Sequence, residues 1–212
     1  MEGPVRNSRL FRGKVFPMKF LYRYRGEILG VFAIALWIFP SGENSFPLSA
    51  AGLAFLGVAL RVEARRVIGE HTRGRGLAAP ELVTFGIYGW LRHPLYLSNL
   101  CFGLAFVRWH LGFCPSAFAF SLLLVLFEIA LAKSEDAFLE RRFGKAFSDW
   151  KNRTAMFFPR MKPEFRRKNF PFSKRNVRTA LWSDRWTWFW LSFYTFSLVA
   201  RGHLNLPFAP NF

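Results

Sequence analysis

Long apolar runs alternate with short polar segments along this chain, and most of the polar segments are basic. Four runs are clear, and a fifth is more aromatic; they cover residues 26–39, 46–60, 95–112, 116–132 and 186–200. A helix needs about 20 apolar residues to cross a membrane, so the first run must borrow flanking aromatics such as Tyr22 and Tyr24, or the bilayer must thin. The pattern predicts an all-α integral membrane bundle of four transmembrane helices, or five if residues 186–200 also cross.

Composition supports the membrane class. The 212 residues are 52% hydrophobic, include 27 Phe and 8 Trp, and carry a formal net charge of +17. A soluble nucleic-acid-binding protein would not concentrate its apolar residues in long runs between basic clusters, so we expect no nucleic-acid partner. The two cysteines, Cys101 and Cys114, lack metal-binding spacing, so we also expect no metal site.

The basic segments predict the orientation of the chain. Residues 1–25, 61–92 and the chain after Ala132 are basic, whereas the loops 40–45 and 108–115 carry only Glu43 and Arg108. Cytoplasmic loops of membrane proteins are enriched in Lys and Arg, so the N-terminus and all three basic segments should be cytoplasmic, at the inner membrane in a bacterium. A cleaved signal peptide is the alternative for the N-terminus, but no small-residue cleavage site follows Phe39 and further runs come after it.

Three parts follow from this pattern: a basic cytoplasmic segment, 1–25, a transmembrane core, 26–159, and a basic, aromatic extension, 160–212. In the extension, basic residues alternate with Phe, which suits anionic lipid headgroups, although a solvated cytoplasmic extension would have the same charge. Its run 186–200 either crosses as a fifth span or lies in the interface as a Trp-rich helix, and the sequence slightly favours the interfacial helix.

Candidate site residues gather where residues 82–96 enter the third run. Pro94 suits the first turn of a helix, so Arg92 and His93 should lie at a helix N-terminus, where unpaired N–H groups attract anions. Tyr96 follows His93 by three residues and should lie beside it, offering a ring and a hydroxyl. Such a cluster suits an adenosine and an amino-acid carboxylate.

The fourth run carries acidic candidates. Glu128, Glu135 and Arg142 recur every seven residues and should fall on one stripe of a continuous helix. Glu128 lies inside the apolar run, where an ionisable residue is a functional candidate by default; the alternative is a structural partner for Arg92 or Arg108. Glu135, at the membrane boundary, is better placed to meet a soluble cofactor.

Two ordered blocks of residues resemble one family. The segments Leu82-Val83-Thr84, Gly86-Ile87-Tyr88 and Arg92-His93-Pro94-Leu95-Tyr96, then Glu135-Asp136, Leu139, Phe143-Gly144, Trp150 and Phe157-Phe158-Pro159, are similar to those of isoprenylcysteine carboxyl methyltransferases and their bacterial phospholipid methyltransferase relatives. The resemblance covers roughly residues 52–159, which makes that core a methyltransferase core. It implies S-adenosylmethionine bound at the cytosolic end of the bundle, with a lipid-like acceptor arriving from the membrane.

The resemblance also implies roles for individual residues. Those expected at the cofactor are Leu82, Val83, Tyr88, His93, Pro94, Leu95, Tyr96, Glu135 and Asp136. Arg92 would orient the cofactor carboxylate or the acceptor. If the acceptor is an amine, it must lose a proton, and Glu135, Asp136 or Glu128 would act as base; the catalytic candidates are therefore Arg92, Glu135 and Glu128.

Departures from the family pattern narrow the acceptor. An Arg that helps to place the substrate of the prenylcysteine enzymes is Leu131 here, which favours a lipid amine such as phosphatidylethanolamine. The alternatives are carboxyl methylation of an isoprenylated cysteine-like substrate, an NADPH-dependent enzyme related to sterol reductases, and a non-enzymatic membrane adaptor.

Overall fold

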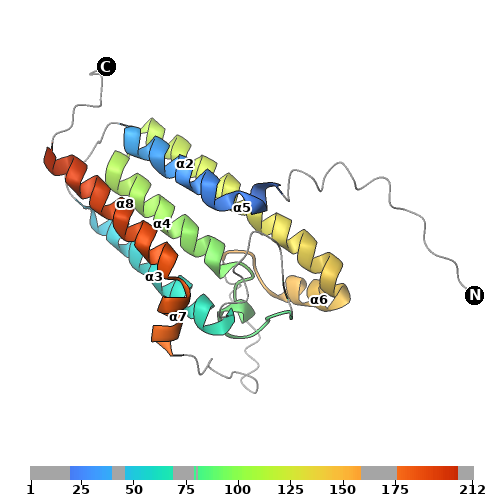
Figure 1. Cartoon of the computed structure of the whole chain (residues 1–212). Coiled ribbons are helices and arrows are strands. Elements are labelled where there is room, and N and C mark those ends of the chain that lie inside the picture. Colours follow the sequence, from blue (N-terminus) through green and yellow to red (C-terminus); the bar gives the residue numbers. More distant parts are fainter. Residues whose placement is uncertain (1–19, 40–45, 69–78, 80, 159–175, 205–212) are drawn as a thin grey trace, which may run out of the picture.

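A computed structural model describes residues 20–39, 46–68, 79, 81–158 and 176–204, and the regular elements among these residues are helices, with no strand. The prediction of an all-α fold is confirmed for them. The long helices lie side by side in a bundle (Figure 1): α2 (Arg25–Ile38), α3 (Leu48–Ile68), α4 (Pro94–Leu111), α5 (Pro115–Phe143) and α8 (Arg185–Leu204). The short elements η1 (Gly86–Gly89), α6 (Lys145–Arg153) and α7 (Val177–Ser183) gather at one end of it.

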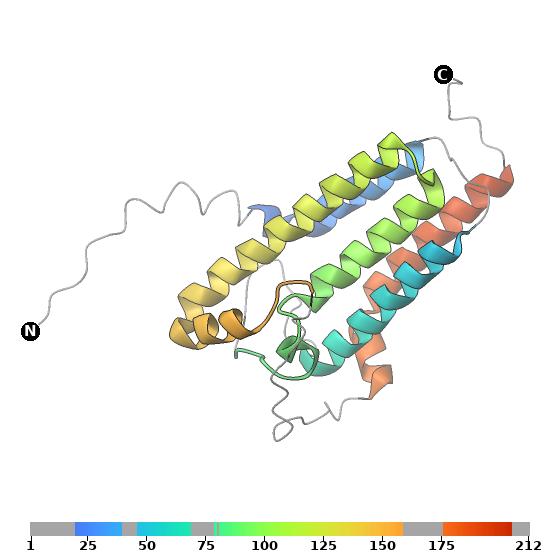
Figure 2. The same ribbon diagram turned by 180° about the vertical axis from the view of Figure 1, so that it is seen from behind.

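Local sequence explains where the central helices begin and end. Pro94 and Pro115 stand in the first turns of α4 and α5, where a missing N–H does no harm. Gly112 (φ 69°) and Gly144 (φ 52°) follow α4 and α5 with positive φ angles, which glycine adopts without steric strain. Gly144 thus turns the chain from α5 directly into α6, and Figure 2 shows α6 folded beside the end of α5.

Small residues let the central helices approach closely. A Cβ atom on Gly103 of α4 would lie 2.2 Å from Cδ2 of Leu124 on α5. Ser98, also on α4, donates a hydrogen bond of 2.8 Å to the carbonyl of Gly57 on α3. Small interface residues of this kind are typical of helices packed inside membranes.

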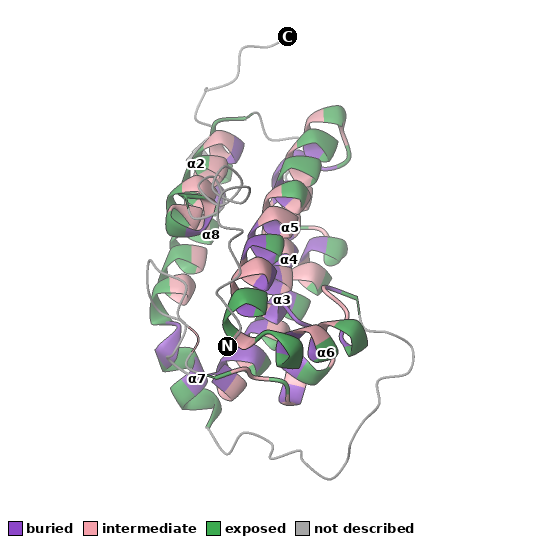
Figure 3. Ribbon diagram, turned by 90° about the vertical axis from the view of Figure 1, so that its right-hand side faces the viewer, coloured by how far each residue is buried: buried purple, intermediate pink, exposed green. Residues whose placement is uncertain are grey.

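The outer surface of the bundle is strongly apolar. Figure 3 shows buried residues turned inwards and exposed residues on the outer faces of the helices. Large apolar side chains are exposed on α3, α5 and α8, including Phe55 (75%), Phe118 (71%) and Phe196 (70%). A patch of this extent on a monomer is typical of a surface that contacts lipid or another protein.

Among the described helices, α5 alone meets the length and hydropathy expected of a membrane span. α2 has only 14 residues, and α3 carries four charged residues in its second half. Four or five crossings therefore stay a prediction.

The helix α5 is continuous through residues 128–142, as predicted, but its predicted stripe is not uniform. Glu128 is fully buried, the side chain of Glu135 is 28% exposed, and Arg142 is exposed. Positions seven apart drift by about 20° per repeat, and α5 ends beside α6. The stripe therefore turns away from the bundle interior before it reaches Arg142.

The helix α8 packs lengthwise against α4 and α2. Tyr194 donates a hydrogen bond of 3.0 Å to the carbonyl of Ala33 on α2, and its ring lies 4.8 Å from that of Phe106 on α4. Trp188 contacts Phe102 of α4 in the same way. Whether α8 crosses as a fifth span or lies in the interface stays a prediction.

Candidate functional site

The two motif blocks meet through their backbones. Leu91 forms a parallel bridge with Ala155. The N–H of Arg92 donates to the carbonyl of Ala155 (2.8 Å), and that of His93 donates to the carbonyl of Met156 (3.3 Å). Residues some 60 positions apart are therefore held together just before α4 begins. The pairing brings the two motif blocks together at one end of the bundle.

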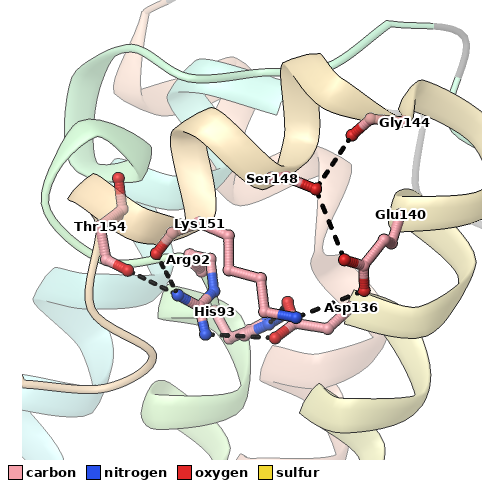
Figure 4. Close-up of polar contacts among 8 residues, drawn as sticks. All are labelled: Arg92, His93, Asp136, Glu140, Gly144, Ser148, Lys151 and Thr154. Atoms are coloured by element: carbon pink, nitrogen blue, oxygen red, sulfur yellow. Dashed lines mark hydrogen bonds and ion pairs between the residues drawn. The ribbon is translucent and has the colours of Figure 1, made fainter.

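Asp136 of α5 is the centre of the site. Its Oδ2 lies 3.1 Å from Nη2 of Arg92, and its Oδ1 lies 2.9 Å from Nε2 of His93. The Nη1 of Arg92 donates to the carbonyls of Thr154 (2.6 Å) and Lys151 (3.0 Å). Figure 4 shows Arg92 pointing between the end of α6 and Asp136. These contacts make Arg92 a clamp between α5 and α6, and its role towards a substrate stays a prediction.

Glu135 is the more accessible carboxylate. Its side chain is 28% exposed against 7% for Asp136, and its Oε2 lies 3.6 Å from Nδ1 of His93. The imidazole of His93 thus bridges two adjacent carboxylates. Its ring centroid is 5.5 Å from that of Tyr96 and 6.5 Å from that of Phe157. His93, Tyr96 and Glu135 are brought together as predicted, and the side chain of Glu135 is partly exposed.

The carboxylates set the protonation of His93. Burial by itself would lower the pKa of His93, but the hydrogen bonds to Asp136 and Glu135 and their charges outweigh it and raise that pKa. Burial would likewise raise the pKa of Asp136, but the bond to His93, its charge and that of Arg92 lower it. The contact between His93 and Asp136 therefore favours the imidazolium form of His93 and the carboxylate form of Asp136.

A pH dependence of stability follows from His93. Because its pKa is raised in the folded protein, its contribution to stability is complete below its ordinary pKa of about 6.5 and is lost as the pH rises through the folded value. We expect the unfolding midpoint of the wild type to exceed that of His93→Gln more at pH 6 than at pH 9, as measured by thermal unfolding in detergent. A difference that grows with pH would contradict this assignment.

Four of the residues expected at the cofactor, Leu82, Val83, Tyr88 and Leu95, pack in or against one apolar cluster beside α3. Tyr88 is buried in a cluster with Phe147 and Trp150, and Leu82, Val83 and Leu95 pack against this cluster. The indole N–H of Trp150 donates to the carbonyl of Tyr88 at 3.2 Å. Burial and then the charge of Glu135 raise the pKa of Tyr88. Tyr88 therefore lies close enough to Glu135 to sense its charge.

Sequence reasoning missed two residues near the site, Tyr22 and Arg65. Burial and then the charge of Glu135 raise the pKa of Tyr22, while Arg25 and Arg65 oppose this. The guanidinium of Arg25 lies 4.2 Å from the centre of the Tyr22 ring. The sequence marks Tyr22 only as an aromatic residue flanking the first apolar run. The signal that would have identified Arg65 is its spacing of four from Arg61, which places both on one face of α3.

Glu128 lies apart from the other candidates. It is fully buried beside Asn99 of α4 and within electrostatic reach of Arg61 on α3, rather than beside the predicted partners Arg92 or Arg108. Nη1 of Arg61 donates to Oδ1 of Asn99 at 2.7 Å. Seven residues separate Glu128 from Glu135, which is about 10 Å along a helix. A role of Glu128 as base stays a prediction.

The side chains present fit S-adenosylmethionine. A partly exposed carboxylate such as Glu135 can accept hydrogen bonds from ribose hydroxyls or an ammonium group. Tyr96 hydrogen-bonds to Glu135. Tyr22 and Tyr88 lie within electrostatic reach of the same carboxylate. Aromatic rings of this kind attract cations, including a sulfonium, and stack on purines.

The family resemblance of the two motif blocks implies a helical bundle with such a cluster at one end. Comparisons with known proteins support this class of protein. Residues 47–146 match the phospholipid methyltransferase family. The chain is 34% identical over 148 residues to the nickel-cobalt-cadmium resistance protein NccN of Alcaligenes xylosoxydans xylosoxydans, covering 67% of this chain and 68% of that protein. No solved structure matches the chain significantly. The chain belongs to the phospholipid methyltransferase family, as its two motif blocks predicted.

Proposed function

We propose that this protein is an integral membrane, S-adenosylmethionine-dependent methyltransferase that acts on a lipid or lipid-linked acceptor, with phosphatidylethanolamine as the favoured acceptor. The observation that supports this most directly is the partly exposed Glu135, set beside the buried His93, Asp136 and Arg92. All four of these residues fall within the family-matched residues 47–146. Leu131, in place of a family Arg, is fully buried and offers no charge to a prenylcysteine carboxylate.

The bound cofactor would supply a methyl group on a sulfonium, which an acceptor displaces in line. The residues of the chain then have to align the two groups and exclude water. Tyr88 and Tyr96 are buried and provide the water-excluding wall. An amine acceptor must lose a proton, and Glu135 is the carboxylate placed to take it. His93 contacts Glu135 and is itself held by Asp136, which also pairs with Arg92, so these three residues would keep Glu135 in position.

The proposed topology has α2, α3, α4, α5 and α8 crossing together, with the N-terminus and the site in the cytoplasm. The basic residues 61–66 and 141–153 lie at the site end. At the opposite end lie Phe113, which is 88% exposed, and the exposed Gly202 near the end of α8. Positive charge concentrated at one end is typical of cytoplasmic segments.

Cysteine labelling in intact bacterial cells tests this topology. In a background without Cys101 and Cys114, we expect a membrane-impermeant maleimide to label Phe113→Cys and Gly202→Cys but not Asp149→Cys, which becomes reactive only after lysis. Asp149 is exposed on α6 and is the control for the site end. Labelling of Phe113→Cys alone would mean that α8 does not cross, and labelling of Asp149→Cys alone would reverse the orientation.

Cofactor binding tests the reaction class. Detergent-purified protein is titrated in parallel with S-adenosylmethionine and with NADPH by calorimetry, and methyl transfer to extracted lipids is then followed with a labelled methyl group. We expect micromolar binding of S-adenosylmethionine alone and label in an amine phospholipid. Binding of NADPH alone would favour the reductase alternative, and binding of neither would favour the adaptor.

A further inference from the structure

Two buried hydrogen-bond donors meet where α2 and α8 end. Nη1 of Arg201 on α8 and Nε1 of Trp37 on α2 are both buried and have no hydrogen-bond partner in the part of the chain that the structure describes. The guanidinium carbon of Arg201 lies 5.1 Å from the centre of the Trp37 ring, which is a cation–π contact. Figure 1 shows the last turns of both helices at the same end of the bundle, away from α6. Buried donors are nearly always bonded in native proteins, so this pair requires an acceptor.

The packing of α8 on α2 holds both donors in place. Tyr194 donates a hydrogen bond of 3.0 Å to the carbonyl of Ala33 on α2. Arg201 follows Tyr194 by seven residues, nearly two helical turns, and therefore lies on the same face of α8. Trp37 follows Ala33 by four residues and lies on the same face of α2. Arg201 and Trp37 are thus a second contact along the same helix pair.

This contact lies far from the proposed methyl-transfer site. His110, in the last turn of α4, donates a hydrogen bond of 2.9 Å from Nε2 to the carbonyl of Phe39, two residues after Trp37. His93 stands just before the first turn of α4. The seventeen residues between the two histidines correspond to about 25 Å along a helix. A ligand at Arg201 is therefore distinct from an acceptor in the methyl-transfer site.

The charges at this end of the bundle favour an anion as the acceptor. Its described residues, 28–39, 46–60, 100–127 and 188–204, include Arg108 and Arg201 but no Asp or Glu. Arg201 therefore has no carboxylate to pair with among them. The planar guanidinium presents its N–H groups in a fork that matches a phosphate, and a second phosphate oxygen would accept from the indole of Trp37.

The surroundings of the two donors favour a lipid as the source of the phosphate. Large apolar side chains are exposed near the ends of both helices: Ile34, Ile38, Phe196 and Val199. Acyl chains would cover these side chains, whereas a free phosphate ion would leave them exposed. We propose that Arg201 and Trp37 bind the phosphate group of an anionic phospholipid, which joins α8 to α2 and is a structural ligand rather than a substrate.

Lipid retention tests this proposal directly. Native mass spectrometry of the detergent-purified chain measures how tightly wild type and variants retain anionic phosphatidylglycerol and zwitterionic phosphatidylcholine. We expect the wild type to prefer phosphatidylglycerol, and Arg201→Gln to weaken its binding about 10- to 100-fold, the range for hydrogen bonds to charged groups. Trp37→Phe keeps an aromatic ring beside Arg201 and removes the N–H donor, so it should weaken the binding about 2- to 10-fold.

Two further variants separate the site from charge and fold. Arg185 is the matched control, because it lies on the same helix with its guanidinium carbon 5.5 Å from the centre of the Trp182 ring, but both residues are exposed. Arg185→Gln should retain phosphatidylglycerol like the wild type. Arg201→Lys, which keeps the charge without the fork, should fall between the wild type and Arg201→Gln. In lipid-free detergent, all variants should unfold within a few degrees of the wild type.

Thermal unfolding separates a lipid from other acceptors. Added phosphatidylglycerol should raise the unfolding temperature of the wild type more than that of Arg201→Gln, and inorganic phosphate should raise neither. Equal stabilisation by inorganic phosphate would assign the site to a free anion. A stability coupling between Arg201→Gln and Glu43→Gln would assign Arg201 to a carboxylate of the chain itself. Either result, or equal retention of both lipids by the wild type, would overturn the proposal.

Discussion

Glu135→Gln should lower the rate of methyl transfer by about 100-fold or more and weaken S-adenosylmethionine binding at least about tenfold. The substitution keeps the shape of the side chain and removes its charge. Loss of one oriented electrostatic group in an active site typically lowers kcat by about 10²–10³. The side chain of Glu135 is 28% exposed, and its ionic contact with His93 is long, at 3.6 Å. We therefore expect the fold to survive the loss of its charge.

A matched control on the same helix makes this result specific. Glu140 of α5 is 49% exposed and pairs with Lys151 at the surface. We expect Glu140→Gln to bind S-adenosylmethionine and transfer methyl groups like the wild type, and both variants to unfold within a few degrees of it. Equal activity of the two variants by labelled-methyl transfer would remove Glu135 from the proposed site.

The second large effect concerns stability. Asp136→Leu leaves the buried guanidinium of Arg92 and the imidazole of His93 without their shared carboxylate. Removing one partner of a buried ion pair typically destabilises by about 3–5 kcal/mol. We expect Asp136→Leu to unfold at markedly lower temperature and to lose cofactor binding, whereas the exposed Asp149→Asn should be neutral.

A double-mutant cycle checks the physical cause. If the cost is an uncompensated buried charge, adding Arg92→Leu to Asp136→Leu should recover part of the lost stability. Thermal unfolding in detergent measures all four species. If the losses in unfolding temperature add up in the double variant, Arg92 and Asp136 stabilise the fold independently. That result would contradict the role of Arg92 as a clamp between α5 and α6.

Much of the fold could be predicted because its helices carry their own signals. Pro94 and Pro115 mark helix starts, and the apolar runs of α4 and α5 are long. The packing of α8 could not be predicted, because Tyr194 meets Ala33 across 161 residues. A contact over that separation leaves no trace in local periodicity.

The site shows the same division. The motif blocks placed His93, Tyr96, Glu135 and Asp136 together correctly, since the resemblance already contained their spatial relation. Glu128 was identified only by its position inside an apolar run, and its neighbour proved to be Asn99 rather than a predicted arginine. Lone polar residues in apolar runs indicate burial and do not indicate partners.

The ion pairs of Asp184, which lies between α7 and α8, with Arg61 and Arg65 of α3 also affect how the protein is made. Arg61 and Arg65 precede Asp184 by 123 and 119 residues. At about 5–20 residues per second, the ribosome delivers that carboxylate about 6–24 s after the two arginines. The earlier helices are therefore made before Asp184 is available to pair with these two arginines.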